Sequence, residues 1–328
     1  MRFLTRKNIR SAAGILLAYV LLQGLNSAGL LSNYVLFIIM VALINAILTV
    51  SLNIITGFAG QFSIGHAGFM AVGAYVSAMF TRFVLNVGPD TPFVWREPAF
   101  LISLFAGSLA AALVAYLIGI PTLRLKGDYL AIATLGFNQV MVVLFNNLDF
   151  VGGPRGFTGI PKLSDLTWVA GLTVVSVLIM RNFVRSIYGS QCVAVREDEI
   201  AAESLGVDVT RYKILAFTLA SFFAGTAGGL LAHLLQLAHP SQFTFLKSID
   251  ILLMLVVGGM GSIPGSIISA LVLTVLPEML RFSQDLRLVI YPVLLIVFVI
   301  KNPLPYLRRV TAQIQERVRA MWVNRFGG

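Results

Sequence analysis

The sequence has little cysteine and little charge for its length. Cys192 is the only cysteine among 328 residues, so no disulfide can form within the chain and a disulfide-built fold is excluded. Charged residues make up 12% of the chain and hydrophobic residues 58%, and the mean hydropathy is +0.88. This balance excludes an ordinary soluble domain and is typical of a membrane protein.

Motifs that would support chemistry of the chain's own are also missing. The phosphate-binding pattern GxxxxGK(S/T) does not occur, so the chain does not hydrolyse ATP by that mechanism. The histidines His66, His233 and His239 have no cluster of cysteines or carboxylates beside them, so we expect no metal site. Ser63 lies near His66, but that spacing alone does not indicate a serine hydrolase. We predict a protein that is not an enzyme and needs no cofactor.

Long apolar runs are present instead. No Asp, Glu, Lys or Arg occurs from Ser11 to Thr81. A helix of about 20 mostly apolar residues crosses a bilayer core of about 30 Å. We therefore predict an all-α polytopic membrane protein with a transmembrane domain over residues 1–303 and about ten (eight to ten) transmembrane helices. The predicted spans lie near residues 11–31, 34–56, 62–81, 99–119, 129–147, 165–180, 213–237, 249–261, 264–280 and 288–300.

The positively charged segments indicate the orientation. Ten spans place both termini on one side of the membrane, together with residues 124–126 and 181–213. Lysine and arginine are concentrated in these segments, so the positive-inside rule makes that side cytoplasmic. We attribute the net charge of +10 to this orientation and expect no nucleic-acid partner. A signal peptide is the alternative to the first span, but the apolar run is longer than signal peptides carry.

The C-terminal residues 304–328 have a pattern of their own. Apolar residues recur there at helical spacing among arginines, which predicts a basic amphipathic tail on the cytoplasmic side. Such a helix can lie on the anionic leaflet of the bilayer or on partner subunits, and the sequence leaves both open. The apolar positions are Leu307, Val310, Ile314, Val318 and Trp322.

Glycine-rich segments interrupt the apolar pattern twice. GFAGQFSIGHAG covers residues 57–68 and GGMGSIPG covers residues 258–265. Paired interruptions can mark an internal repeat whose broken helices meet at a transport pathway. The two segments do not align in register, so the repeat stays open.

Polar residues in and after the first glycine-rich segment are candidates for lining a translocation path. Irregular backbone at membrane depth is tolerated where it lines a cavity. The alternative is close helix packing at the glycines, with the polar groups bonded between helices. The candidates are Gln61, Ser63, His66, Thr134, Asn138 and Gln139.

The densest cluster of charge lies at residues 181–213. This segment holds ten of the chain's 38 charged residues, which are 24 Lys and Arg and 14 Asp and Glu. Within it we predict a short helix over residues 196–205. Gly206 should end this helix, because glycine adopts the left-handed C-cap geometry without steric cost. A stiff helix between two spans can transmit force from a partner to the bundle.

This charged segment resembles the coupling (EAA-type) loop of ABC importer permeases. Residues 187–217 are similar to the version in the LivM-type permeases of branched-chain amino-acid importers. Four further segments resemble that family in the same order, so the resemblance covers nearly all of residues 33–300. They are TGFAGQFSIGHAGFMAVGAY (56–75), GDYLAIATLGFNQV (127–140), GGPRGFTGIP (152–161) and VVGGMGSIPGSIISALVLTVLPE (256–278).

The resemblance implies a permease subunit of an ATP-driven importer in a bacterial inner membrane. Its partners would be a second, homologous permease, two cytoplasmic ATPase subunits and an extracytoplasmic binding protein that delivers branched-chain or related hydrophobic amino acids. The loop at about residues 186–212 would then couple the chain to an ATPase. Its coupling residues would be Arg196, Glu197, Glu199, Ala202, Glu203 and Gly206.

Two alternatives stay open on the sequence. Related permeases for urea or short amides look similar in these segments. An ion-coupled carrier that works without ATPases is the competitor from another class, and such carriers often place an ionisable residue within the membrane. Asp250, Glu278 and His66 come near the interior of a predicted span, and we expect the first two to cap helix ends.

Overall fold

The computed structural model describes residues 32–87, 92–123, 125 and 127–279. The spans predicted at 11–31 and 288–300 and the predicted tail at 304–328 lie outside these residues. The described α-helices are α2 (Asn33–Asn53), α3 (His66–Met79), α4 (Phe93–Thr122), α5 (Asp128–Asn147), α6 (Leu166–Val184), α7 (Ile187–Glu197), α8 (Glu199–Ser204), α9 (Val209–Leu235), α10 (Phe245–Gly258) and α11 (Ile263–Met279).

Shorter elements join or extend these helices. Two π-helices continue α2 and α3, and three 3-10 turns lie in the loops. They are η1 (Ile54–Phe58), η2 (Phe80–Val84), η3 (Asp149–Val151), η4 (Gly153–Arg155) and η5 (Pro240–Phe243). Two-residue strands β1 (Phe157–Thr158) and β2 (Leu237–Ala238) pair antiparallel, with Phe157 opposite Ala238.

Seven helical segments of the described residues are long and apolar enough to cross a membrane. The predicted class, an all-α polytopic membrane protein, is confirmed at this level. The apolar helix α11 is shorter, so the number of spans predicted for the whole chain stays a prediction. The seven segments are Asn33–Phe58, His66–Val84, Val94–Thr122, Asp128–Asn147, Leu166–Val184, Val209–Leu235 and Pro240–Gly258.

The first glycine-rich segment breaks the helical chain, as the sequence predicted. The π-helix η1 ends α2, residues 59–65 are not helical, and α3 begins at His66. The span predicted at 62–81 therefore started too early. The backbone turns at Gly60, whose φ of 70° is open to glycine and strained for other residues. Single π turns of this kind occur often at functional sites.

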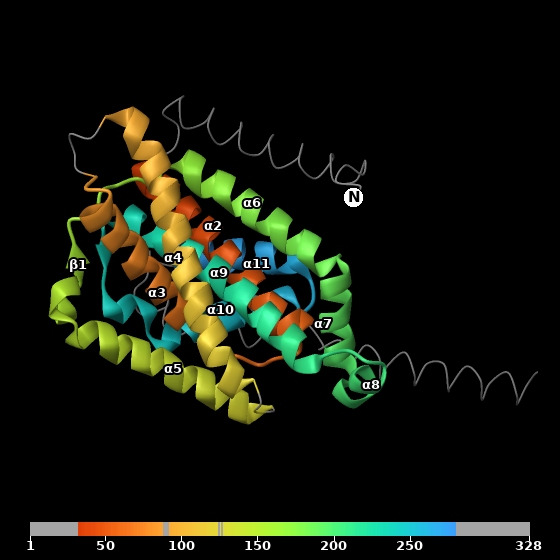
Figure 1. Cartoon of the computed structure of the whole chain (residues 1–328). Helices are drawn as coiled ribbons and strands as arrows, with labels where there is room; N and C mark the ends of the chain where they lie inside the picture. Colours follow the sequence, from red (N-terminus) through yellow and green to blue (C-terminus); the bar gives the residue numbers. More distant parts are fainter. Residues whose placement is uncertain (1–31, 88–91, 124, 126, 280–328) are drawn as a thin grey trace, which may run out of the picture. The chain divides into compact units, whose positions relative to one another are not determined.

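Helix α9 is the centre of the described bundle. It packs against α2, α3 and α4, and α4 crosses it in Figure 1. Glycines let these backbones approach closely, because a Cβ on Gly73 would lie 2.2 Å from the Cα of Gly225. A Cβ on Gly228 would lie 2.0 Å from the carbonyl oxygen of Met70. Small residues commonly drive helix association in membranes in this way.

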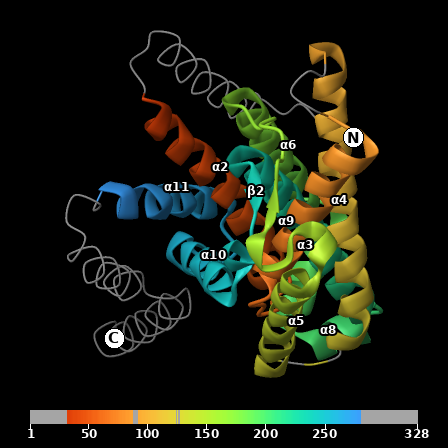
Figure 2. The ribbon, with the colours of Figure 1, turned by 90° about the vertical axis from the view of Figure 1, so that its left-hand side faces the viewer.

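The remaining helices surround this centre. Helices α6 and α10 pack against α2, and α5 packs against α3, as Figure 2 shows from the side. The β1–β2 pair lies at one end of the described helices, and α7 and α8 lie at the opposite end (Figure 1). Residues 187–204, which form α7 and α8, therefore lie at the opposite end of the described helices from the β1–β2 pair (Figure 1).

Candidate functional site: a coupling segment and two helix breaks

Residues 186–212, predicted to couple the chain to an ATPase and called the coupling segment below, contain two short helices, α7 and α8, where the sequence predicted one helix over residues 196–205. Helix α7 ends at Glu197 and α8 starts at Glu199, because Asp198 is extended, with φ −158° and ψ 112°. The Asp198 carboxylate accepts hydrogen bonds from the N–H groups of Ile200 and Ala201 at 2.9 and 3.0 Å. An aspartate side chain that caps the next helix competes with continuation of the previous one.

The end of α8 is as predicted. Gly206 has φ 84°, and its N–H donates to the carbonyl of Glu203 at 2.9 Å. The N–H of Val207 donates to the carbonyl of Ala202 at 3.0 Å, which completes a Schellman motif. A Cβ on Gly206 would meet no atom within 4 Å, so the left-handed backbone, and not space, requires glycine there.

The six predicted coupling residues divide into those that face the bundle and those that face outward. Ala202 is only 3% exposed, and Glu199 forms an ion pair with Lys213 of α9. Glu203 and Gly206 are exposed. The side chains of Arg196 and Glu197 are 31% and 50% exposed and form an ion pair with each other. Of the six, Ala202 and Glu199 therefore face the bundle, and Glu203 and Gly206 face outward.

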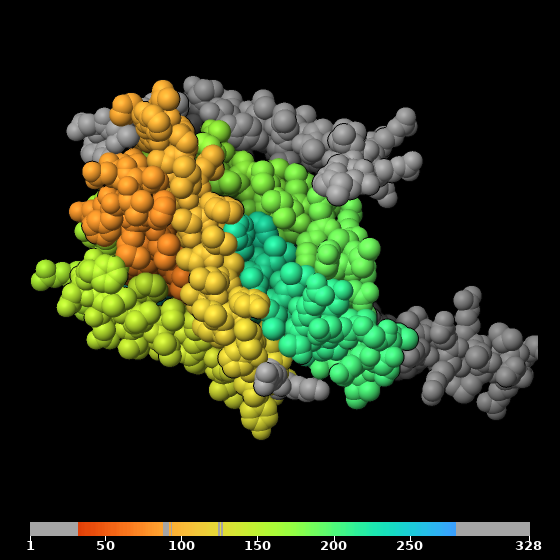
Figure 3. Space-filling model, in the orientation of Figure 1, coloured from red at the N-terminus to blue at the C-terminus, as the bar shows by residue number. Residues whose placement is uncertain are grey.

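Two exposed apolar side chains of α8 and its C-cap were missed. Ile200 is 76% exposed and Leu205 is 85% exposed, and they flank Glu203 along α8. The segment α7–α8 forms one corner of the described surface in Figure 3. The alternation of apolar and charged residues in REDEIAAESLG could have indicated an amphipathic helix with an apolar outer edge.

Most of the polar residues predicted to line a path lie in or beside the first glycine-rich segment, residues 57–68, which is called the first break below. Gln61, Ser63, His66, Thr134 and Asn138 are buried, whereas Gln139 is exposed on α5.

Other helices hold the first break in place through side chains that bond its backbone and His66. Thr134 accepts from the N–H of Ile64 at 3.1 Å, Ser248 accepts from the N–H of Ala67 at 3.0 Å, and Ser51 lies 2.7 Å from the His66 ring.

Two buried amides in this group have no partner of their own. The side-chain nitrogen and oxygen of Gln61 and of Asn138 make no hydrogen bond among the described residues. Gln61 is 3% exposed and Asn138 is fully buried. Burying an unbonded amide costs about 1–3 kcal/mol in proteins, so such groups usually have a partner such as water or a ligand.

The first break (residues 57–68) and the second glycine-rich segment (residues 258–265, the second break) are far apart in the sequence but lie side by side in the structure. The Asn53 side chain connects them, because its oxygen accepts from the N–H of Gly261 at 2.8 Å and its nitrogen donates to Ser266 of α11 at 2.9 Å. A Cβ on Gly57 would lie 2.6 Å from the Gly261 nitrogen. The sequence predicted both breaks but not the role of Asn53.

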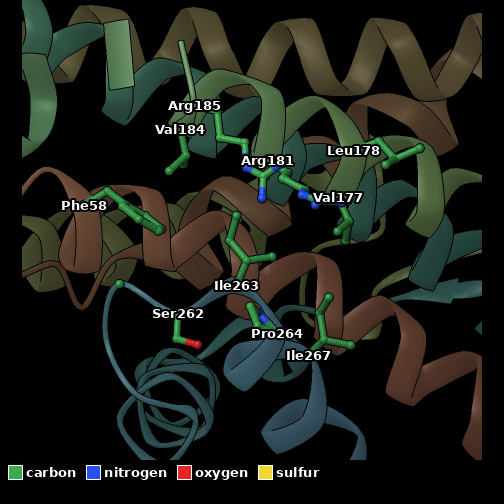
Figure 4. A pocket seen from close by; sticks show the side chains of 11 residues that line it. Phe58, Val177, Leu178, Arg181, Val184, Arg185, Ser262, Ile263, Pro264 and Ile267 are labelled. Carbon is green, nitrogen blue, oxygen red and sulfur yellow. The ribbon is translucent and has the colours of Figure 1, made fainter. Parts of the chain in front are cut away.

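A groove of about 580 Å³ borders the second break (Figure 4). Arg181 and Arg185 lie on its α6 wall and Ser262 lies on the opposite wall (Figure 4), and Gly261 also lines the groove. Within the described part of the chain, the second break therefore has open space on one side. The other lining residues are Phe58, Val177, Leu178, Val184, Ile263, Pro264 and Ile267.

A second polar cluster joins α2, α10 and α11 and was also missed. The Lys247 ammonium donates to the Asn45 oxygen at 2.9 Å, and the Asn45 amide nitrogen donates to Thr274 at 2.9 Å. Asp250 stands in the interior of α10, so the prediction that it caps a helix end was wrong. A lone lysine in the apolar run FLKSIDILLMLV is the signal that could have found this cluster.

No group of three or more His, Cys, Asp or Glu side chains comes together among the residues that the structure describes. His233 instead faces Ser77 and Thr81 at 3.3 Å each, and its other ring nitrogen lies 3.1 Å from the carbonyl of Pro161. Its surroundings are those of a hydrogen-bonded residue between helices.

Comparison with known proteins places these features in one family. Residues 34–299 match the family described as the permease component of branched-chain amino acid transport systems. The matched range contains both glycine breaks, the buried polar residues and the coupling segment. No solved structure gives a significant match to the chain.

Individual relatives agree with this match. The high-affinity branched-chain amino acid permease protein LivM of Salmonella typhimurium is 33% identical over 296 residues, which cover 80% of this chain and 67% of the relative. LivM of Escherichia coli is 34% identical with the same coverage. LivH of Salmonella typhimurium, a permease protein of the same kind of system, is 25% identical over 70% of this chain and 79% of the relative.

Proposed function

Because the chain belongs to the permease-component family of branched-chain amino acid transport systems, we propose that it carries branched-chain or related hydrophobic amino acids across a bacterial inner membrane, powered by ATPase partners. The match over residues 34–299 carries this proposal. Its proposed partners are a second, LivH-like permease, two cytoplasmic ATPase subunits and an extracytoplasmic binding protein. Both termini and the coupling segment lie in the cytoplasm.

The proposed ATPase contact is the outer edge of α8. Ile200, Glu203 and Leu205 are exposed there, and apolar side chains with one charge between them suit a protein groove better than water. Ala202 faces the bundle, and Lys213 joins the helix to α9 through Glu199. A push on α8 is thereby passed to the central helix of the bundle.

The proposed path runs along the first break. Gln61 and Asn138 supply amide groups that bond no other described residue, and Ser63, His66 and Thr134 are buried as well. An amino acid in transit needs weak and replaceable polar contacts, since tight binding would slow its release. Gln139 points away from this group, and its exposed position on α5 suits contact with the second permease or with solute between the two permeases.

Reconstitution tests this function. The chain should co-purify with nucleotide-binding subunits, and vesicles containing the complex should take up leucine when ATP and binding protein are supplied. Uptake driven by a proton or sodium gradient without ATPases would support the ion-coupled carrier instead. Competition by urea or short amides, and not by leucine, would identify the other substrate class.

Charge reversal on α8 tests the ATPase contact. Glu203→Lys should reduce co-purification of the ATPases and ATPase stimulation by about tenfold, a loss typical of one important interface residue. Asp149→Lys is the matched control, because it reverses an exposed carboxylate far from α8. Asp149 lies in η3, at the same end of the described helices as β1. Equal co-purification by both variants would contradict the contact.

A further inference from the structure

Arg196 connects the coupling segment to the first helix break. Its Nη1 donates to the carbonyl oxygen of Gly57 at 2.7 Å, although the two residues are 139 positions apart in the sequence. Gly57 lies in the π-helix η1, one residue before its last. A carbonyl at the C-terminal end of a helix carries partial negative charge, so a guanidinium there makes a charge-assisted hydrogen bond.

The first break is shaped around this arginine. A Cβ on Gly60 would lie 2.7 Å from the Cγ of Arg196 and 3.2 Å from its Cα. Only glycine lets the backbone of the first break contact the aliphatic part of the Arg196 side chain this closely. Gly60 also has φ 70°, so its conformation and its contact both favour glycine.

The second break reaches the same guanidinium. A Cβ on Gly261 would lie 3.5 Å from the Arg196 Nη1 and 3.8 Å from the Gly57 carbonyl oxygen. The N–H of Gly261 is held by Asn53, one turn before Gly57 in the chain. Arg196 thus stands where the end of α7 and both glycine breaks come within contact distance of one another.

The rest of the guanidinium is held within the coupling segment. Its Nε donates to a carboxylate oxygen of Glu197 at 3.2 Å, and Nη2 forms an ion pair with the same oxygen. The planar guanidinium therefore bonds the coupling segment on one side and the break on the other. A lysine ammonium lacks this fixed fork and cannot reproduce both contacts with the same geometry.

We propose that Arg196 is a positioning residue for transport. It transmits movement of the coupling segment to the two glycine breaks and is not part of the surface that contacts the ATPase. This inference rests on the proposed function and names the internal connection that it requires. Displacement of α8 moves the end of α7, and the Arg196–Gly57 hydrogen bond moves the end of η1 with it. The first break carries Gln61 and Ser63, so the polar group there is rearranged.

Uncoupling is the test. The assembled complex with Arg196→Ala should retain its ATPases and hydrolyse ATP, while leucine uptake per ATP falls by about tenfold, the change expected when one hydrogen bond to a charged group is lost. Arg196→Lys should restore part of the leucine uptake per ATP hydrolysed that Arg196→Ala loses. Arg155→Ala, which removes an exposed arginine in η4, is the matched control and should keep the wild-type ratio of leucine uptake to ATP hydrolysis. Loss of ATPase co-purification in Arg196→Ala, or a wild-type ratio, would overturn the proposal.

A second readout does not depend on the solute. Phe62 lies in the first break and is 38% exposed, so Phe62→Cys in a Cys192→Ala background reports on that segment. Its maleimide labelling should differ between nucleotide-free and vanadate-trapped complexes, and Arg196→Ala should abolish the difference. Gly60→Ala should act like Arg196→Ala, whereas Gly171→Ala, whose Cβ would meet nothing within 4 Å, should not.

The outcomes separate the two proposals. A nucleotide response that persists in Arg196→Ala overturns the role of Arg196 and leaves the importer intact. A wild-type complex that takes up no leucine when ATP and binding protein are supplied overturns the importer, and the role of Arg196 with it.

Discussion

Cys192 shows how a single position in the coupling segment depends on its surroundings. The residue is 1% exposed in α7, and its thiol lies 3.7 Å from the carbonyl of Tyr212, the hydrogen-bond acceptor on α9. Burial raises the pKa of the Cys192 thiol from 9.0 to about 11. The thiolate is the reactive form, so the folded protein keeps this cysteine inert.

A pH series of alkylation tests this inertness. Below pH 9 the folded protein should react with maleimide about a hundredfold more slowly than the denatured chain, because the thiolate fraction falls tenfold for each unit of raised pKa. Reaction of the folded protein should rise only as the pH approaches 11. Mass spectrometry of alkylated protein, with SDS-denatured protein as control, measures both rates. Equal rates at pH 8 would show that the thiol is accessible.

At the scale of elements, the boundary between α7 and α8 matters most. Asp198 ends one helix and caps the next, so α8 is a separate helix of six residues, which is less than two turns. A helix this short is not stable alone in water. Its stability comes from the Asp198 cap, the Gly206 turn, the buried Ala202 and the ion pair between Glu199 and Lys213.

Removal of the cap should loosen α8 without unfolding the bundle. Asp198→Ala should cost about 1 kcal/mol locally, the usual value of an N-cap hydrogen-bonded side chain. Hydrogen exchange at the amides of Ile200 and Ala201 should become faster, and ATPase co-purification should weaken. Asp165→Ala is the control, since Asp165 is the N-cap residue of α6 and makes no side-chain cap hydrogen bond. Unchanged exchange in Asp198→Ala would contradict the role of the cap.

At the scale of the whole molecule, orientation in the membrane is the property that labelling can decide. Leu205 is 85% exposed on α8, and Phe150 is 64% exposed in η3. The helix α6 is the candidate span between them along the chain, so they should lie on opposite sides of the bilayer. In a Cys192→Ala background, Leu205→Cys should react with impermeant maleimide only in inside-out vesicles. Phe150→Cys should react in intact cells, and the reverse pattern would refute the orientation.

The fold class and the two breaks could be predicted from the sequence because they depend on local composition. Uncharged apolar runs indicate spans, and glycines interrupt helices wherever they cluster. The single helix predicted over residues 196–205 was wrong, because a capping side chain at Asp198 outweighed helix propensity. Long spans tolerate errors of a few residues at each end, but a six-residue helix does not.

The sequence by itself determined the family, the membrane class, the charged coupling segment and the left-handed end of α8 at Gly206. Each follows from residues that are neighbours in the chain. Only the tertiary structure decided that Arg196 meets Gly57, that Asn53 joins the two breaks, and that Lys247 bonds Asn45 within the bundle. These pairs are separated by more than a hundred positions, and their contacts follow from helix packing around α9, which no local pattern encodes.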